Sequence, residues 1–260
     1  MPVAITRQVS PRFDECERTC IARVPIDVGI ARSQHGAYVR ALRALGCEVI
    51  ELPAEPDLPD SVFVEDIALV LPEAAVITRP GADSRKPERD SVASALAPYR
   101  PLLHIVAPAR LDGGDVLVLG RTLYVGLSTR SGPAAIAQLN DLLGGFGYTA
   151  AGVEVRGCLH LKSAVTALGD DALLVNPDRV DVSRFEGFEC IEVDPAEPDA
   201  ANCLPVGGSV ICSAAYPRTR EKLERLGYRV VAIALDELAK AEGAVTCCSL
   251  LIPGDPPEGR

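Results

Sequence analysis

A histidine, several carboxylates and two adjacent cysteines stand in short polar segments of this chain, each just before an apolar run typical of a strand. In chain order these residues are Asp60, Glu65, Asp66, Asp112, Asp115, His160, Cys247 and Cys248. Carboxylates attract a cation, a thiolate is a strong nucleophile, and an imidazole can move protons near neutral pH. If the segments meet in the fold, they predict a cavity that binds a small cation and attacks it with sulfur.

The segments belong to a weak internal repeat, which is the reason to expect them together. Strand–turn–strand patterns occupy residues 63–81, 111–131, 159–179 and 202–219, and residues 246–253 match the first half of a fifth copy. Aligning Asp66, Asp115, Ser163 and Ser249 gives steps of 49, 48 and 86 residues, the last equal to two steps of about 43. Equivalent corners of a pseudo-symmetric array face a common centre, so different side chains at these corners converge there.

Helical patterns lie between the hairpins and end at glycine before another strand-like run. We expect them in residues 26–45, 131–143 and 220–226. The unit is therefore hairpin, helix, strand, repeated about five times, which is typical of an α/β propeller whose units bury one another. Strands from both chain ends are expected to complete the last unit, since closure removes exposed sheet edges. Residues 1–260 are expected to form one domain, with a charged, mobile loop at 82–89 and a polar tail at 253–260.

Composition excludes several classes of protein. Lys and Arg number 26 against 36 Asp and Glu, for a net charge of −10, so no basic face for nucleic acid is expected. The apolar runs 67–72 and 230–235 are far shorter than the roughly 20 residues of a membrane-spanning helix. The nine cysteines are spread without C-x-x-C spacing and the start has no signal-peptide pattern. We expect a cytoplasmic protein with reduced thiols.

The other two histidines, the Asp-Gly-Gly-Asp motif and Cys248 each have an ordinary structural interpretation. His35 falls inside an amphipathic helical pattern and His104 inside the apolar run LLHIV, so packing roles are expected for both. LDGGDV could be a plain hairpin whose glycines supply positive φ. Cys248 is expected to act as a small buried hydrophobe. Only the combination of segments favours a site.

That combination resembles a known family. DSVFVEDIAL, ITRPGADSRKPE, LDGGDVL, LSTR, LHLKSAVT and EGAVTCCSLLIP occur here in this order. They are similar to the motifs of the dimethylarginine dimethylaminohydrolases, of the guanidine-modifying or pentein superfamily. The resemblance runs from about Val3 to Pro253 and implies a five-bladed pseudo-symmetric α/β propeller of ββαβ units. It implies hydrolysis of N-methylated L-arginine to L-citrulline and methylamine or dimethylamine, through a covalent S-alkylthiouronium on cysteine.

The resemblance also implies roles for individual residues. Cys247 resembles the nucleophile because it follows Thr246, and His160 resembles the general acid and base. Asp112 resembles the carboxylate that orients the histidine and, with Asp66, holds the guanidinium. The other residues implied to bind substrate are Asp60 and Ala241 at the α-amino group, Glu65 beside Asp66, and Arg85 and Arg130 at the α-carboxylate.

One position departs from the family pattern. The loop that closes over the substrate has an apolar residue in the family, and counting back from Asp27 places Arg18 there. Arg18 is therefore included among the substrate-binding candidates. A fixed positive charge facing a cationic substrate would be unfavourable at short range. This position leaves the identity of the guanidine open, although it does not change the reaction class.

Three alternatives remain. One is a related enzyme for another guanidine, arginine or agmatine; deiminases of arginine carry an extra helical domain, and agmatine gives the two arginines no carboxylate. A non-catalytic pentein predicts loss of the cysteine, histidine and acidic set, which this chain retains. A third is zinc held by Cys247, Cys248 and His160, although adjacent cysteines suit a tetrahedral site poorly. We expect no cofactor, an inhibitory zinc at most at Cys247 and His160, and a monomer or homodimer.

Overall fold

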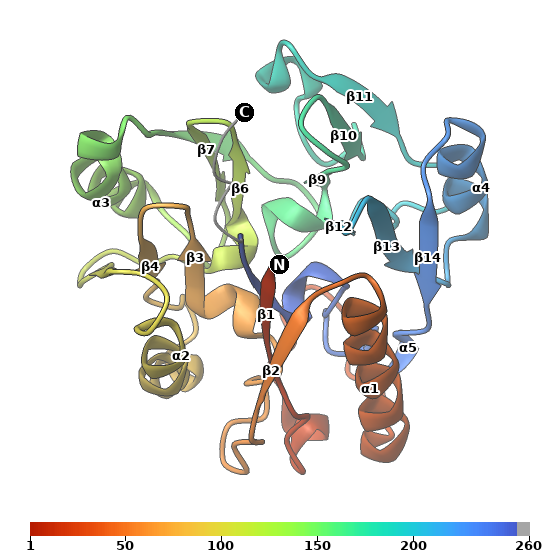
Figure 1. Cartoon of the computed structure of the whole chain (residues 1–260), viewed down its shortest axis with the longest axis horizontal. Helices are drawn as coiled ribbons and strands as arrows, with labels where there is room; N and C mark the ends of the chain where they lie inside the picture. The colour runs from red at the N-terminus through yellow and green to blue at the C-terminus, as the bar shows by residue number, and fades with distance from the viewer. Residues whose placement is uncertain (254–260) are drawn as a thin grey trace.

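Five three-stranded sheets stand around a central axis, and the longer helices lie on the outer rim (Figure 1). The computed structural model describes residues 1–253, so the predicted tail lies outside the described residues apart from Pro253. This arrangement confirms the predicted five-bladed α/β propeller.

Each sheet has the same construction: an antiparallel hairpin whose second strand pairs in parallel with a third strand. Four sheets are consecutive in sequence. They are β3–β4–β5 (Ala68–Val70, Ala75–Ile77, Leu102–His104), β6–β7–β8 (Val116–Leu119, Thr122–Leu127, Thr149–Glu154), β9–β10–β11 (Val165–Ala167, Ala172–Val175, Glu189–Glu192) and β12–β13–β14 (Cys203–Val206, Ser209–Ser213, Val230–Ile233). The hairpin strands nearest the axis are apolar on both faces, because neighbouring blades cover them.

The fifth sheet is closed by both ends of the chain, as predicted. β1 (Val3–Arg7) lies between β15 (Leu250–Ile252) and β2 (Glu48–Leu52). Val3 pairs antiparallel with Ile252 and parallel with Glu48. The N-terminal strand therefore takes the central place in a blade whose inner strand comes from the C-terminal part of the chain.

In each blade one connection joins two parallel strands, and helices make four of these five connections. They are α1 (Val28–Ala44), α2 (Arg89–Leu96), α3 (Pro133–Leu143) and α4 (Pro217–Arg225), with a shorter α5 (Asp236–Ala239) before the last hairpin half. The blade β9–β10–β11 differs from the predicted unit: its crossover is the 3-10 turn η7 (Val182–Phe185). Phe185 is buried there and covers the blade that a helix would otherwise cover.

Helix α1 links the rim to the last hairpin half. The Asp27 carboxylate caps the helix by accepting from the Ile30 N–H, at 2.9 Å. Residues 31, 35, 38, 39 and 42 form its buried face. The Tyr38 hydroxyl shares a buried 2.7 Å hydrogen bond with Ser249 Oγ, which fixes the turn carrying the two adjacent cysteines.

Residues 82–89 are not the mobile loop expected from their charge. They form a 3-10 turn, η3 (Asp83–Glu88), that runs directly into α2, and Arg85 and Glu88 are buried. Arg85 forms ion pairs with Glu88 of the same segment and with Asp66 in the protein interior. A high density of charged residues in this segment therefore did not make it an exposed loop. The prediction failed because a pair three residues apart on one turn can be neutralised locally.

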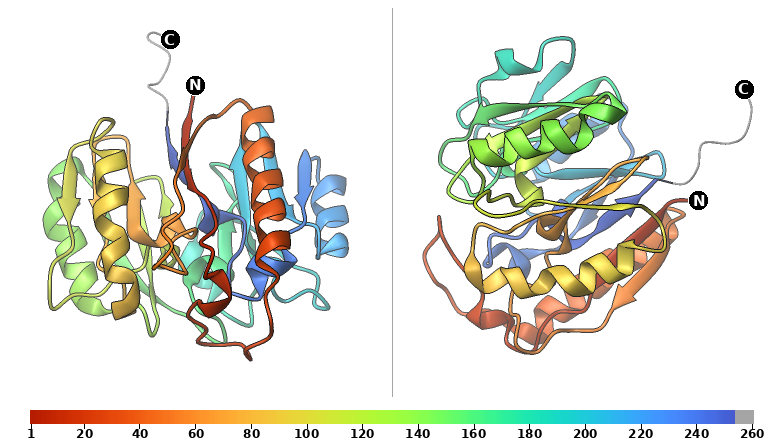
Figure 2. Two further views of the ribbon diagram at one scale, coloured as in Figure 1. Left: turned by 90° about the horizontal axis from the view of Figure 1, so that it is seen from below. Right: turned by 90° about the vertical axis from the view of Figure 1, so that its left-hand side faces the viewer.

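The segment after β1 lies at the end of the molecule opposite to the two termini (Figure 2). It contains the 3-10 turn η1 (Phe13–Glu15) and continues irregularly through residues 16–27 to α1. We call residues 16–27 the lid. Among the described helices, none has the length and apolar character needed to cross a membrane.

Candidate active site

Four short 3-10 turns occupy the predicted equivalent corners. They are η2 (Val64–Ile67), η4 (Gly113–Asp115), η6 (Leu161–Ser163) and η8 (Thr246–Cys248), each leading into the first strand of a blade. The turns and the residues just before two of them carry Glu65, Asp66, Asp112, Asp115, His160, Cys247 and Cys248. η2 contacts both η4 and η8, and η4 contacts η6. Pseudo-symmetry therefore brings together segments up to about 180 residues apart, as the repeat predicted.

The glycines of η4 allow this close approach. A Cβ on Gly114 would lie 2.7 Å from both the Asp66 carboxylate and the His160 ring, and one on Gly113 would collide with the Glu65 carbonyl. Neither glycine has a positive φ. The Asp-Gly-Gly-Asp motif thus needs glycine for space, and the hairpin interpretation based on φ was wrong.

Two cysteines, adjacent in sequence, face different surroundings. Cys247 lines a small cavity together with His160, Asp66 and Ala241. Cys248 is fully buried in an apolar core, where its thiol donates to the Ala244 carbonyl at 3.6 Å. Only Cys247 is therefore placed to meet a substrate. Burial, together with the charges of Glu65 and Asp66, raises the pKa of Cys247 well above that of a free thiol, so the resting sulfur is protonated.

His160 is held by two carboxylates. Its Nε2 lies 3.0 Å from Asp112 Oδ2, and its Nδ1 lies 3.8 Å from Asp66 Oδ1. Burial by itself would lower the pKa of His160, but the charge of Asp66 and the hydrogen bond to Asp112 raise it to about 9. The imidazole is therefore protonated near neutral pH and can donate a proton.

Asp112 and Asp115 have distinct supporting contacts. Asp112 is fully buried, and its Oδ1 accepts from the Gly81 N–H at 2.7 Å. Asp115 accepts from the Leu161 N–H at 3.0 Å and from the Ser128 hydroxyl at 2.6 Å. Asp112 orients the ring of His160, while Asp115 fixes the backbone immediately after it.

Arg85 is arranged differently from the substrate clamp that we expected. Its Nη1 donates to Asp66 Oδ2 at 2.5 Å, and its Nε and Nη2 donate to Glu88 at 3.0 and 2.9 Å. Nη2 also reaches the Phe63 carbonyl. Although burial opposes it, the charges of His160 and Arg85 hold the pKa of Asp66 below its usual range. Arg85 lines the cavity, but most of its N–H groups hold Asp66 and Glu88, so it positions a carboxylate.

Arg130, Asp60 and Ala241 all line the cavity, and the first two contact residues 16–27. The Arg130 Nη2 donates to the Thr19 hydroxyl at 2.8 Å, and the Glu17 N–H donates to Asp60 Oδ2 at 3.1 Å. Both partners belong to the lid. The cavity measures about 20 Å³, which is room for roughly one water molecule, so a larger molecule fits only if residues that line the cavity move.

Arg18 does not face the cavity, which corrects our expectation. Its guanidinium turns back on its own loop and donates to the Val24 carbonyl at 2.7 Å. The lid residue that lines the cavity is Glu17, and Glu242 lines it from the segment before Cys247. The direction of a side chain in an irregular loop depends on the path of the backbone, which counting along the sequence does not give. The unfavourable charge that left the substrate open is therefore not in the cavity.

Glu65 is also placed differently from the expectation. Its carboxylate does not line the cavity; it accepts from Lys162 at 2.6 Å and from the Thr246 hydroxyl at 2.7 Å. The Asn202 side-chain amide donates a hydrogen bond to the Thr246 hydroxyl and accepts one from the Thr246 N–H. This network lies behind the cysteine-bearing turn and supports it. Lys162 was overlooked, although it stands in the LHLKS motif.

His35 and His104 lie away from the cavity, and the three residues of the zinc alternative do not meet. His35 is buried in α1 as expected, whereas His104 is exposed at the end of β5 and does not pack. Within residues 1–253, Asp66, Asp112 and His160 form the group whose possible ligand atoms lie within 4.8 Å of one another. Cys248 points into the core, so the structure does not bring Cys247, Cys248 and His160 together as a zinc site.

Comparisons with known proteins show the family of this chain. The family model "N,N dimethylarginine dimethylhydrolase, eukaryotic" matches residues 13–252. A dimethylarginine dimethylaminohydrolase of Streptomyces coelicolor is 41% identical over 95% of both chains. One of Pseudomonas aeruginosa is 38% identical over 86% of this chain and 89% of its own. A solved structure of a Pseudomonas aeruginosa enzyme, a cysteine-to-serine mutant complexed with citrulline, covers 96% of this chain and 98% of its own, with 34% identity and a TM-score of 0.89. This chain belongs to the dimethylarginine dimethylaminohydrolase family, a family of hydrolases that act on guanidino compounds.

Proposed function

We propose that this protein hydrolyses N-methylated L-arginine, as asymmetric dimethylarginine or monomethylarginine, to L-citrulline and dimethylamine or methylamine. The observation that carries the proposal is the cavity shared by Cys247, His160, Asp66 and Arg130. It combines a nucleophile, a proton donor, a carboxylate for a guanidinium and a cation for a carboxylate. Family membership and the citrulline complex of a relative support the same substrate and product.

Binding and activation come first. Arg130 binds the α-carboxylate, Asp60 and the Ala241 carbonyl accept from the α-ammonium, and Asp66 accepts from the guanidinium nitrogens. The bound guanidinium places a positive charge beside Cys247, which lowers the pKa of the thiol, and its proton leaves to solvent. The thiolate then attacks the central guanidinium carbon, whose plane the carboxylate holds.

Proton transfer by His160 completes both halves of the reaction. Protonated His160 donates to the methylated nitrogen, the C–N bond breaks, and the neutral amine leaves an S-alkylthiouronium on Cys247. Neutral His160 then takes a proton from water, and the resulting hydroxide adds to the same carbon. The C–S bond breaks, the sulfur recovers a proton from the collapsing hydroxyl, and citrulline is released. Asp112 keeps the imidazole oriented in both steps.

We expect zinc to act as an inhibitor. The two residues expected to hold it, Cys247 and His160, line the same cavity, and Asp66 and Asp112 lie with His160 within reach of one ion. A bound ion would replace the His160–Asp112 hydrogen bond. Zinc should therefore stop turnover reversibly. Addition of a chelator alone should leave both activity and the melting temperature unchanged; unfolding by the chelator would instead indicate a structural metal.

The deciding experiment measures citrulline release from asymmetric dimethylarginine, with arginine and agmatine in parallel and Cys247→Ser as the blank. Turnover of dimethylarginine well above that of arginine supports the proposal. Preference for arginine would make the protein a deiminase, and preference for agmatine would contradict the role of Arg130. No turnover of any of the three by a folded protein would reject the hydrolase.

A further inference from the structure

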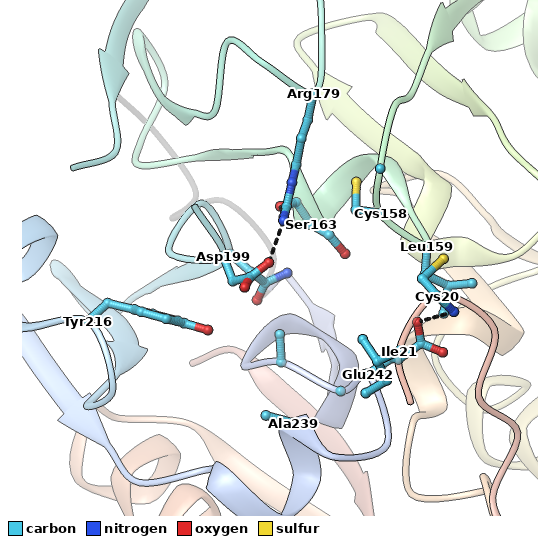
Figure 3. Close-up of a pocket in the computed structure, with 14 residues that line it drawn as sticks. Cys20, Ile21, Cys158, Leu159, Ser163, Arg179, Asp199, Tyr216, Ala239 and Glu242 are labelled. Atoms are coloured by element: carbon cyan, nitrogen blue, oxygen red, sulfur yellow. Dashed lines mark hydrogen bonds and ion pairs between the residues drawn. The ribbon is translucent and has the colours of Figure 1, made fainter. Parts of the chain in front are cut away.

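Glu242 joins the lid to the segment that carries the nucleophile. Its Oε2 accepts from the Thr19 N–H at 2.5 Å and its Oε1 from the Cys20 N–H at 2.9 Å, across more than 220 residues of sequence. Figure 3 shows the Glu242 carboxylate turned toward Cys20. A carboxylate that accepts two backbone N–H groups is a strong, charge-assisted contact. The lid is therefore fastened at the point where it crosses the cavity.

The backbone of Glu242 is unusual for its residue type. It has φ +60°, and among the described residues it is the one non-glycine with a positive φ. The Gly243 N–H donates to the Leu238 carbonyl and the Glu242 N–H to the Ala239 carbonyl, both at 3.0 Å. These two bonds form a Schellman motif at the end of α5, with Glu242 at the left-handed position where glycine is preferred.

Such a conformation costs free energy for any residue with a Cβ, and glycine would relieve it. Eight of the glycines in residues 1–253 do occupy positive-φ positions, so the fold uses glycine where only the backbone matters. A glutamate at this position is thus explained by what its side chain does. The side chain holds the lid, and the left-handed turn aims it there.

Few other contacts hold the lid at this point. Cys20 and Ile21 border a second cavity of about 320 Å³ (Figure 3). Leu159, Glu242 and Gly243 line both this cavity and the one that contains Cys247. The lid is therefore not packed against the core on that side. Its polar contacts there are the two hydrogen bonds to Glu242.

Among the described residues, three other side-chain contacts join residues 17–19 of the lid to distant segments of the chain. In one of them the Ser84 hydroxyl donates to Glu17 Oε1 at 2.6 Å, and the other two involve groups that substrate needs. Arg130 holds the Thr19 hydroxyl and Asp60 holds the Glu17 N–H, yet these side chains are assigned above to the substrate α-carboxylate and α-ammonium. Substrate bound as proposed would share these two groups with the lid or displace the lid from them. The Glu242 contacts involve no assigned substrate group, so the lid can keep them with substrate enclosed.

We propose that Glu242 is a positioning residue that latches the lid over the occupied site by accepting from Thr19 and Cys20. Its effect on catalysis depends on the proposed function, whereas its effect on the lid does not. A latch adds binding free energy only in the closed complex and keeps bulk water from the thiouronium until His160 activates one molecule. Its loss should raise KM for dimethylarginine more than it lowers kcat.

The test is Glu242→Gly, because this change removes the carboxylate and relieves the backbone at once. Hydrogen exchange of the lid amides is followed by mass spectrometry on peptides covering residues 14–27. We expect exchange about tenfold faster or more at Thr19 and Cys20, a KM raised about tenfold, and a melting temperature unchanged or higher. Glu242→Gln keeps the side-chain size and should lie between the wild type and the glycine variant.

Glu224→Gln, an exposed change in α4, is the matched control and should alter none of these values. Unchanged lid exchange in Glu242→Gly would overturn the latch even if KM rose, because the glutamate would then act on the substrate directly. A fall in melting temperature with unchanged lid exchange would assign it a structural role instead. Since exchange is measured without substrate, failure of the proposed reaction cannot be mistaken for failure of the latch.

Discussion

The Nε2 atom of His160 lies 3.0 Å from Asp112 Oδ2, and both side chains are almost completely buried. One residue comes from the position before η6 and the other from the position before η4, on neighbouring blades. Because the Asp112 carboxylate also accepts from Gly81, it can hold the imidazole in one orientation. This pair sets the proton chemistry of the site.

Asp112→Asn should weaken that chemistry. The substitution removes the Asp112 charge, which opposes the effect of burial on His160. The pKa of His160 should therefore fall from about 9. The decline of kcat at alkaline pH should move to lower pH, and kcat should fall about 100-fold or more. Asp170→Asn, in an exposed hairpin turn, serves as the control. An unchanged alkaline limb in the Asp112→Asn variant would remove Asp112 from the mechanism.

The two adjacent cysteines provide a matched pair of variants. Cys247→Ser should reduce citrulline release by about 10³-fold or more with the fold intact, because the nucleophile is lost. Cys248→Ser should keep most activity and lower the free energy of unfolding by about 1 kcal/mol, since a hydroxyl replaces a buried thiol. Citrulline assays and thermal unfolding of both proteins check this. Equal loss of activity in the two would mean that the wrong sulfur was chosen.

Replacing each of the two cavity arginines by alanine should affect a different property of the protein, substrate binding for Arg130 and stability for Arg85. Arg130→Ala should fold and raise KM for dimethylarginine, while turnover of an N-methylated guanidine without a carboxylate stays the same. Arg85→Ala should destabilise the protein by about 3–5 kcal/mol, because it leaves Asp66 and Glu88 buried without their cation. Chemical denaturation and KM on both substrates distinguish them. A stable Arg85→Ala protein that loses only carboxylate binding would restore the original clamp.

His35 should make stability depend on pH. Burial lowers its pKa to about 4 in the folded protein, against an ordinary value of 6.5, and its Nε2 has no hydrogen-bond partner among the described residues. The unfolded chain therefore binds the proton first, and stability present above pH 6.5 is lost as pH falls towards 4. The loss should reach about 3 kcal/mol at most. His35→Phe should remove this part of the acid sensitivity; parallel unfolding curves for both proteins between about pH 4 and 6.5 would contradict the assignment.

Much of the architecture was predictable from sequence because it is a repeat. Spacings of 49 and 48 residues between Asp66, Asp115 and Ser163 placed equivalent corners, and pseudo-symmetry alone requires such corners to converge. The choice of Cys247 over Cys248 came from the resemblance to the family, in which the nucleophile follows a threonine, as Cys247 follows Thr246. The blade β9–β10–β11 broke the pattern, because a buried Phe185 on a 3-10 turn covers it without a helix.

The residue types at each corner and their convergence were thus determined by the sequence itself. The tertiary structure alone decided which partner each charge finds: Arg85 takes Asp66 and Glu88, Glu65 takes Lys162 and Thr246, and Arg18 turns back on the lid. Charge pairing depends on distances of a few ångströms between segments far apart in the chain, and on which of them water can reach. Glu242 shows the same limit, because neither its left-handed backbone nor its hydrogen bonds to the lid are visible until α5 and the lid lie side by side.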